Sequence, residues 1–162
     1  MTEETRAFEG GCTCRAVRYT MTSKPLFVHC CHCRWCQRET GTAFALNALI
    51  EPERMQVQGE VELVDTPSNS GKGQVIARCR KCLVALWSNY GGLGDVLRFV
   101  RVVTLDEPDR LPPYIHIFTM SKQPWVKLDD GKPVMKEYYK SADYWPKESL
   151  ERRAKIFPPK AA

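Results

Sequence analysis

The chain has 162 residues, of which 24 are Lys or Arg and 19 are Asp or Glu, and its formal net charge at pH 7 is +5. This length fits one domain with a core of its own. No stretch approaches the roughly 20 apolar residues of a membrane span, and the start MTEETRAFEGG lacks the apolar run of a signal peptide. We therefore expect a soluble, cytoplasmic protein without a membrane partner.

Short strands between clusters of Gly, Pro, Asn and Ser predict a mainly β domain. In chain order, the expected strands are residues 16–21, 43–50, 55–57, 61–64, 74–78, 83–88, 96–104 and 114–119. A helical turn is expected at 35–40, closed by Gly41, and a terminal helix at 146–153. The glycine-rich stretches 66–74 and 91–95 are expected to be turns, since neither precedes the helix of a phosphate-binding loop.

The sequence predicts a single domain over residues 1–146, followed by a charged C-terminal tail over residues 147–162. The tail ends in PPKAA, which we expect to be loose. We find no internal repeat and no low-complexity segment that would indicate a second unit.

The cysteines form three close groups. In chain order these are Cys12 and Cys14; Cys30, Cys31, Cys33 and Cys36; and Cys79 and Cys82. Cysteines one or two residues apart rarely reach disulfide geometry, so this spacing favours metal binding over the alternative of disulfide pairing. Seven thiolates on two Zn²⁺ ions would change the formal charge by −7 + 4 = −3, from +5 to +2. The basic residues are also interleaved with acidic ones, which weighs against a nucleic-acid partner.

The pair Cys79-x-x-Cys82 between two predicted strands is typical of a zinc knuckle, a tight turn that directs both sulfurs to one point. A structural zinc takes four ligands, and Cys12-x-Cys14 is the expected second pair, because residues i and i+2 of an extended segment face the same side. These four cysteines predict a closed site that serves folding. The alternative is that this site is the reactive one.

Cys31, Cys33 and Cys36 offer three ligands on one short segment. Catalytic zinc usually has three protein ligands and keeps a fourth position open, so we expect these cysteines to form the catalytic site. The alternatives are a redox-sensitive cluster, or a closed site whose fourth ligand is His29, Cys30 or His32. Alternation along a strand would turn Cys30 and His32 away from Cys31 and Cys33, and we expect Cys30 to be buried without binding this metal.

Five segments carry a family resemblance. They are GGCTCRAVRY (10–19), HCCHCRWCQRETG (29–41), ARCRKCLVALW (77–87), TLDEP (104–108) and HIFTMSKQPW (116–125). With these, the chain resembles the glutathione-dependent formaldehyde-activating enzyme family, which includes centromere protein V. The resemblance implies a mainly β, Mss4-like β-tent with a zinc knuckle and few short helices. It also implies two zinc ions per chain, a structural one on Cys12, Cys14, Cys79 and Cys82 and a catalytic one on Cys31, Cys33 and Cys36.

Two positions depart from the family pattern. Members usually have glycine after the CxC and after the CxxC, where this chain has Arg15 and Leu83. Glycine at a knuckle relieves the strain of a positive φ angle, so Leu83 predicts a somewhat different turn.

Three thiolates give a zinc site a net charge of −1, which disfavours water activation and favours a sulfur in the open position. With the resemblance, this predicts a carbon–sulfur lyase similar to S-(hydroxymethyl)glutathione synthase. Its substrates would be a small thiol such as glutathione and formaldehyde or another small aldehyde. The alternatives are a non-catalytic zinc module that binds a protein or nucleic acid, and a redox sensor with an exposed reactive thiol.

Other side chains have two interpretations each. Arg34 and Arg38 could balance the charge of the thiolates or be solvated surface residues. His116 lies in YIHIF, where alternation places Tyr114, His116 and Phe118 on one face, and it could donate a proton to an alkoxide or be a packed, hydrogen-bonded histidine. The core or a pocket wall is the expected place of Trp87, Trp125 and Trp145.

Overall fold

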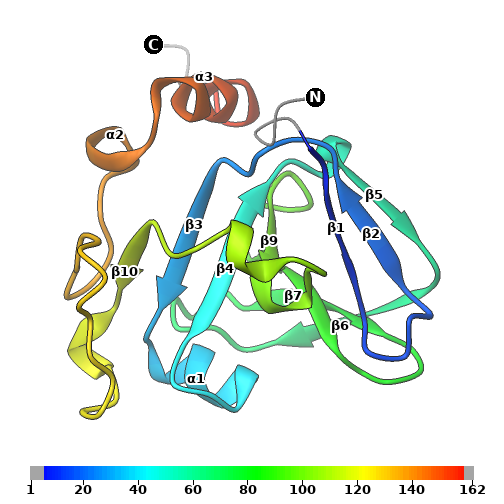
Figure 1. Ribbon diagram of the computed structural model, residues 1–162, viewed down its shortest axis with the longest axis horizontal. Coiled ribbons are helices and arrows are strands. Elements are labelled where there is room, and N and C mark those ends of the chain that lie inside the picture. Colours follow the sequence, from blue (N-terminus) through cyan, green and yellow to red (C-terminus); the bar gives the residue numbers. More distant parts are fainter. Residues whose placement is uncertain (1–5, 159–162) are drawn as a thin grey trace.

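The structure is a computed structural model and describes residues 6–158. Within this range the chain forms ten strands in two sheets, joined by loops and short helices (Figure 1). The expected mainly β fold with few short helices is therefore confirmed. Parts of the predictions for MTEETRAFEGG and PPKAA fall on residues 1–5 and 159–162, outside the described residues.

The strands are β1 (Phe8–Gly11), β2 (Arg18–Met21), β3 (Phe27–Cys31), β4 (Ala45–Ile50), β5 (Met55–Gln58), β6 (Val61–Thr66), β7 (Gln74–Cys79), β8 (Ala85–Tyr90), β9 (Arg98–Arg101) and β10 (Ile115–Ile117). The α-helices are α1 (Arg34–Thr40), α2 (Ser141–Tyr144) and α3 (Lys147–Ile156). The 3₁₀ helices are η2 (Pro52–Arg54), η3 (Val102–Thr104), η4 (Pro108–Arg110) and η5 (Thr119–Ser121).

The small sheet has the order β1-β2-β5 and the large sheet the order β10-β3-β4-β9-β8-β7-β6. Neighbouring strands are antiparallel except β10 and β3, which run parallel at the edge of the large sheet. Each of the eight expected strands overlaps an observed one, and β1 and β3 are additional. The helical turn closed by Gly41 is also confirmed, as α1 ends at this glycine with a φ of 68°.

Strands β3 and β4 are covered on both faces, which is why all five residues of β3 are buried. One face belongs to a core between the two sheets, to which Val28, Ala48 and Val100 contribute. Phe27, Cys31 and Leu49 point to the other face, where a second core includes residues from the C-terminal part of the chain. The functional cavities described below lie on this second face.

Helix α3, predicted at 146–153, lies near the end of the large sheet where β3 begins, whereas α1 lies where β3 ends (Figure 1). It is held by Arg152, whose Nε and Nη2 donate to the two carboxylate oxygens of Glu51 at 2.8 and 2.5 Å. Both side chains are about nine-tenths buried, at 10% and 9% exposure. Residues 147–156, assigned from the sequence to a charged tail, thus contact the end of β4.

The three tryptophans expected in the core or a pocket wall differ in burial. Trp87 and Trp145 are buried, as expected. Trp125 is 72% exposed, so its expected place in the core or a pocket wall is wrong. It lies in the loop after η5, where no element covers the ring.

Candidate metal centres and reaction cavity

Cys12, Cys14, Cys79 and Cys82 converge, and their four sulfurs all lie within 4.8 Å of one another. The Sγ atoms of Cys12 and Cys14 are 3.5 Å apart, and those of Cys14 and Cys79 are 3.7 Å apart. Four sulfurs at about 2.3 Å from a tetrahedral zinc would be roughly 3.8 Å from one another. The donor set therefore fits a closed zinc site, which would join the loop after β1 to the loop after β7.

The two loops that carry these cysteines have the same backbone pattern. Cys12 N–H donates to Val17 O at 3.1 Å, and Cys79 N–H donates to Val84 O at 3.0 Å. Arg15 and Leu83, one after each second cysteine, both have a φ of 60°. The expectation that Leu83 changes the turn is therefore wrong, because the loop keeps the left-handed conformation without a glycine.

The Cys12 loop also differs from its expected extended shape, since Arg15 N–H donates to Cys12 O at 3.0 Å and closes a turn. Backbone amides face the sulfurs: Val17 N–H lies 3.3 Å from Cys12 Sγ, and Lys81 N–H lies 3.4 Å from Cys79 Sγ. Burial alone would raise the pKa of Cys12, but the Val17 amide and the thiols of Cys79 and Cys14 lower it. The loop thus favours at Cys12 the thiolate form that a metal requires, whereas the neighbouring thiols raise the pKa of Cys14 to about 11.

Cys31, Cys33 and Cys36 form a second group, with all three sulfurs within 4.8 Å of one another. Cys31 ends β3, Cys33 precedes α1 as its N-cap, and Cys36 lies in the first turn of that helix. Cys36 N–H donates to Cys33 Sγ at 3.3 Å. All three side chains are buried at the base of a cavity.

Mutual interactions divide the charge unequally among these thiols. Hydrogen bonds from Cys31 and Cys36 lower the pKa of Cys33 to about 3. The hydrogen bonds of Cys31 with Cys33 and Cys36 raise the pKa of Cys31. The pKa of Cys36 is raised to about 11, with a Cys31 contact that opposes the effects of Cys33 and burial. The group alone holds one thiolate easily and three only with a cation among them, as a metal ion would provide.

The cavity above these cysteines has a volume of about 440 Å³. Its lining includes His29, Trp35, Asn47, Tyr90, Phe118 and Tyr138, together with the loop at Ser68–Ser70. The alternation of side chains accounts for this: His29 and Cys31 share a face of β3, and Asn47 pairs with His29 on β4.

Arg101 on β9, which is not among the residues predicted from the sequence, is a buried cation whose charge acts on Cys36. It pairs with Asn47 in the register of β4 and β9, is 5% exposed, and donates to Asn47 Oδ1 at 2.7 Å and to Ser88 Oγ at 3.3 Å. Among residues 6–158, no carboxylate forms an ion pair with it, and its Nε has no partner. Its charge lowers the pKa of Cys36, although that pKa is raised overall. A signal was present in the sequence as one arginine inside the apolar stretch FVRVV.

The two arginines that could balance the charge of the thiolates do not reach the cavity. Arg34 donates to Gln37 Oε1 at 3.1 Å, and Arg38 is exposed in the last turn of α1. Neither side chain lines the cavity that contains the three cysteines. Both arginines thus match the interpretation as surface residues.

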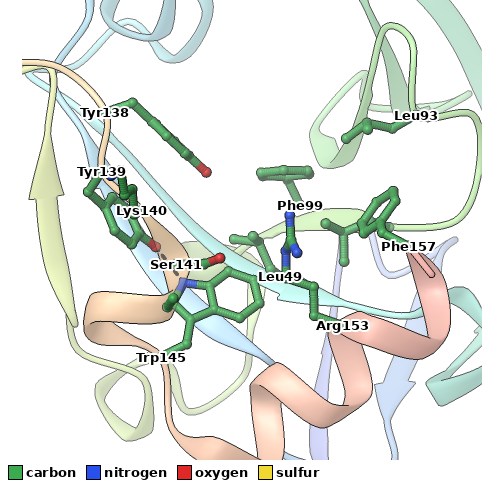
Figure 2. Close-up of a pocket in the computed structure, with 12 residues that line it drawn as sticks. Leu49, Leu93, Phe99, Tyr138, Tyr139, Lys140, Ser141, Trp145, Arg153 and Phe157 are labelled. Atoms are coloured by element: carbon green, nitrogen blue, oxygen red, sulfur yellow. Dashed lines mark hydrogen bonds between the residues drawn. The ribbon is translucent and has the colours of Figure 1, made fainter. Parts of the chain in front are cut away.

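A second cavity of about 520 Å³ adjoins the first, and the two share Leu93, Phe99 and Tyr138. Figure 2 shows the guanidinium of Arg153 reaching from α3 toward Phe99, with Trp145 and Tyr139 on the opposite wall. Together the two linings include the cations Lys72, Lys140 and Arg153 and no described Asp or Glu. The combined space therefore suits an anionic ligand.

His29 is a buried imidazole at the boundary of these cavities. Trp145 Nε1–H donates to the Tyr139 hydroxyl at 2.6 Å, and the same hydroxyl lies 2.6 Å from His29 Nε2. Burial lowers the pKa of His29 to about 3, which keeps the ring neutral.

His116 does not line the cavity, so the packed, hydrogen-bonded interpretation holds and the role of proton donor is wrong. Its Nδ1 is 3.0 Å from His32 Nε2, and its Nε2 is 2.8 Å from Asp130 Oδ2. Alternation fails two residues after His116: Phe118 has a φ of 54°, and both Ile117 and Phe118 line the cavity. Cys30 is 1% exposed and lies with His32 and His116, apart from Cys31.

Comparisons with known proteins agree with the cysteine pattern. The sequence model of one family, described as glutathione-dependent formaldehyde-activating enzyme, matches residues 7–121, more than two thirds of the chain. No functionally curated protein matches significantly. The crystal structure of a Rhodobacter sphaeroides protein is similar with 16% sequence identity and a TM-score of 0.44, over 78% of this chain and 98% of that one. Among the described residues, no helix combines the length and apolar character that crossing a bilayer requires.

Proposed function

We propose that the chain, which belongs to the glutathione-dependent formaldehyde-activating enzyme family, is a zinc-dependent carbon–sulfur lyase. It would form or cleave the adduct of an acidic thiol such as glutathione with formaldehyde or another small aldehyde. The observation that carries this proposal is the group of three cysteines at the base of a cavity, together with a buried arginine that acts on Cys36 and forms no ion pair with a described carboxylate.

In this proposal Cys12, Cys14, Cys79 and Cys82 hold a structural zinc, and Cys31, Cys33 and Cys36 hold a second one. Zinc bound to the second group would lower the pKa of an incoming thiol and keep it as a thiolate. The charge of Arg101 offsets the negative charge that gathers there, without occupying the cavity itself. Because the seven cysteines must remain reduced, we place the protein in the cytoplasm.

The adjoining cavity would bind the carboxylates of the thiol. Arg153 offers a planar, bidentate guanidinium, and Lys140 and Lys72 add two ammonium groups along the same space. Lys72 lines the cysteine cavity itself, and the apolar residues Leu93 and Phe99 line both cavities where they meet. The thiol would therefore lie along the sheet, with its sulfur at Cys36 and its carboxylates toward α3.

In the forward reaction, the thiolate sulfur adds to the carbonyl carbon of the aldehyde. The new carbon–sulfur bond forms as the carbonyl π electrons move to oxygen, and a neutral His29 ring with its proton on Nδ1 would donate a hydrogen bond to that oxygen. Partial burial raises the pKa of Tyr138, which keeps its hydroxyl protonated at neutral pH and able to protonate the alkoxide. In reverse, the adduct hydroxyl returns its proton as the carbon–sulfur bond breaks.

The proposal is tested with zinc-loaded protein, formaldehyde and a panel of thiols, by following adduct formation against the uncatalysed background. Adduct formation should be accelerated strongly with glutathione. With a small neutral thiol such as 2-mercaptoethanol it should be accelerated weakly, because this thiol lacks the carboxylates that the cations bind. Tyr138→Phe should lower kcat and leave KM for glutathione unchanged. No acceleration with any thiol, at full zinc occupancy, would leave a non-catalytic zinc module as the function.

A further inference from the structure

A third group of possible metal ligands lies on the face of β3 opposite the cavity. His116 on β10 pairs with Cys30 on β3 in the parallel register, and His32 follows Cys30 by two residues. Residues with these relationships point to the same face of a sheet. The side chains of all three are buried, at 1%, 0% and 5% exposure for Cys30, His32 and His116.

The donor atoms of this group are spaced as ligands of one ion would be. All of them lie within 4.8 Å of one another, with Cys30 Sγ 3.5 Å from His32 Nε2 and His32 Nε2 3.0 Å from His116 Nδ1. Bond lengths of about 2.3 Å to sulfur and 2.0–2.1 Å to nitrogen imply S···N and N···N separations of roughly 3.3–3.6 Å around a tetrahedral zinc. Shifts of a few tenths of an ångström would therefore suffice to admit an ion.

Asp130 supplies the carboxylate to which a metal-bound histidine usually donates its second ring N–H. Its Oδ2 lies 2.8 Å from His116 Nε2, the ring nitrogen that faces away from Cys30. A carboxylate in this position fixes the histidine tautomer so that Nδ1 presents a lone pair to the metal. The side chain of Asp130 is 37% exposed. Solvent therefore reaches the residue that is hydrogen-bonded to His116. One thiolate and one carboxylate would balance the charge of a divalent ion.

We propose that Cys30, His32 and His116 form a third metal site, which takes a borderline or soft ion such as Zn²⁺. The site would fasten the short edge strand β10 to β3, behind the strand that ends at Cys31. It is separate from the two zinc sites of the proposed function and does not depend on the lyase activity. Cys30 is then a ligand, but of a different ion from the one expected at Cys31, Cys33 and Cys36.

The test is a count of zinc per chain in protein that is reduced, loaded with excess Zn²⁺ under anaerobic conditions and then desalted. Wild-type protein should retain three zinc ions, and Cys30→Ala and His116→Gln should each retain two. His29→Gln removes an equally buried imidazole from the other face of β3 and should retain three. Near-UV circular dichroism of each variant distinguishes loss of one site from unfolding.

Asp130→Asn provides a graded test that leaves the core untouched. It should keep three zinc ions but weaken one of them by roughly 10- to 100-fold in competition with a chelator, since loss of a supporting carboxylate usually has that effect. With Co²⁺, the third ion should show weaker sulfur-to-metal absorption than the other two, because it has one thiolate. If wild-type protein retains only two zinc ions, Cys30, His32 and His116 are linked by hydrogen bonds alone and the proposal is overturned. Three zinc ions in folded Cys30→Ala and His116→Gln would also overturn it.

Discussion

The guanidinium of Arg101 donates a hydrogen bond of 2.7 Å to Asn47 Oδ1 across the β4–β9 pair, and no described carboxylate forms an ion pair with it. A buried ion without a partner costs several kcal/mol, so its presence needs a compensating charge nearby. The thiolates of Cys31, Cys33 and Cys36 are the candidates, since the charge of Arg101 acts on Cys36. Arg101 is therefore expected to support metal binding rather than folding.

Arg101→Met should fold and lose zinc affinity at the three-cysteine group. The apolar side chain has a similar length and removes the cost of burying the cation, so stability should hold or rise. Without the cation, affinity for the zinc at this group should fall by roughly 10- to 100-fold, as for other groups that support metal ligands. Chelator competition measures this, and Arg101→Lys, which keeps the charge, should lose less. Unchanged affinity in Arg101→Met would contradict the role.

Arg153→Gln should raise KM for glutathione by about tenfold and leave kcat unchanged. The guanidinium lines the adjoining cavity away from the cysteines, so its loss removes binding to the carboxylate in substrate and transition state alike. A charge-assisted hydrogen bond is worth about 1.5 kcal/mol or more, and tenfold corresponds to about 1.4 kcal/mol. Lys155→Gln is the matched control, since Lys155 lies on the same helix and outside both cavities. Equal effects of the two variants would point to general electrostatics.

Leu83→Gly should stabilise the folded protein. Leu83 has a φ of 60° and is 57% exposed, so glycine removes a strained conformation and little packing. The left-handed conformation costs about 1–2 kcal/mol for a residue with a Cβ atom, and the added flexibility of the unfolded chain offsets part of this. The free energy of unfolding in urea should therefore rise by about 1 kcal/mol. Leu83→Ala keeps the Cβ atom, and a gain as large as that of glycine would refute this explanation.

Arg152→Gln should destabilise the protein by roughly 3–5 kcal/mol, because it leaves the Glu51 carboxylate buried without its partner. Thermal unfolding of metal-loaded protein measures the loss. Since Arg152 is next to Arg153, KM for glutathione should rise as well. Glu51→Gln tests the same pair from the other side, and a loss below 1 kcal/mol in both variants would mean that the pair does not anchor α3.

The same pair predicts a pH dependence. Burial alone would raise the pKa of Glu51, but hydrogen bonds from Arg152 outweigh it, and the pKa is lowered in the folded protein. The stability that the pair contributes is therefore complete above the unfolded pKa of about 4.3 and is lost as pH falls through the lower, folded value. The stability difference between wild type and Glu51→Gln should be constant near neutral pH and shrink below about pH 4. Taking the difference cancels the loss of zinc at low pH, which both proteins share.

Local spacing explains how much of the site could be predicted. The separation of Cys30 from Cys31 follows from alternation along one strand, and the grouping of Cys31, Cys33 and Cys36 follows from their short spacing. The β3 strand itself was not assigned, because its run FVHCC is buried on both faces and shows no alternation of polar and apolar residues.

Contacts between distant segments explain what could not be predicted. Tyr138 and Arg153 line the cavities from the C-terminal segment, Arg101 acts on Cys36 from β9, and no sequence spacing relates these residues to the cysteines. The nearest arginines in sequence, Arg34 and Arg38, point elsewhere, because a helix of two turns displays most of its side chains to solvent. The positive φ angles at Arg15 and Leu83 could not be predicted either, since residues with a Cβ atom rarely adopt them.

The central claim is that one cysteine group serves folding and the other serves the reaction, and the most direct test is the rate of adduct formation in folded Cys36→Ser. This variant should retain the four-cysteine zinc site and the wild-type near-UV circular dichroism, while glutathione and formaldehyde combine only at the uncatalysed rate. Cys79→Ser, the matched control, should fail to fold. Wild-type rates in folded Cys36→Ser, or equal loss of folding in both variants, would contradict the account.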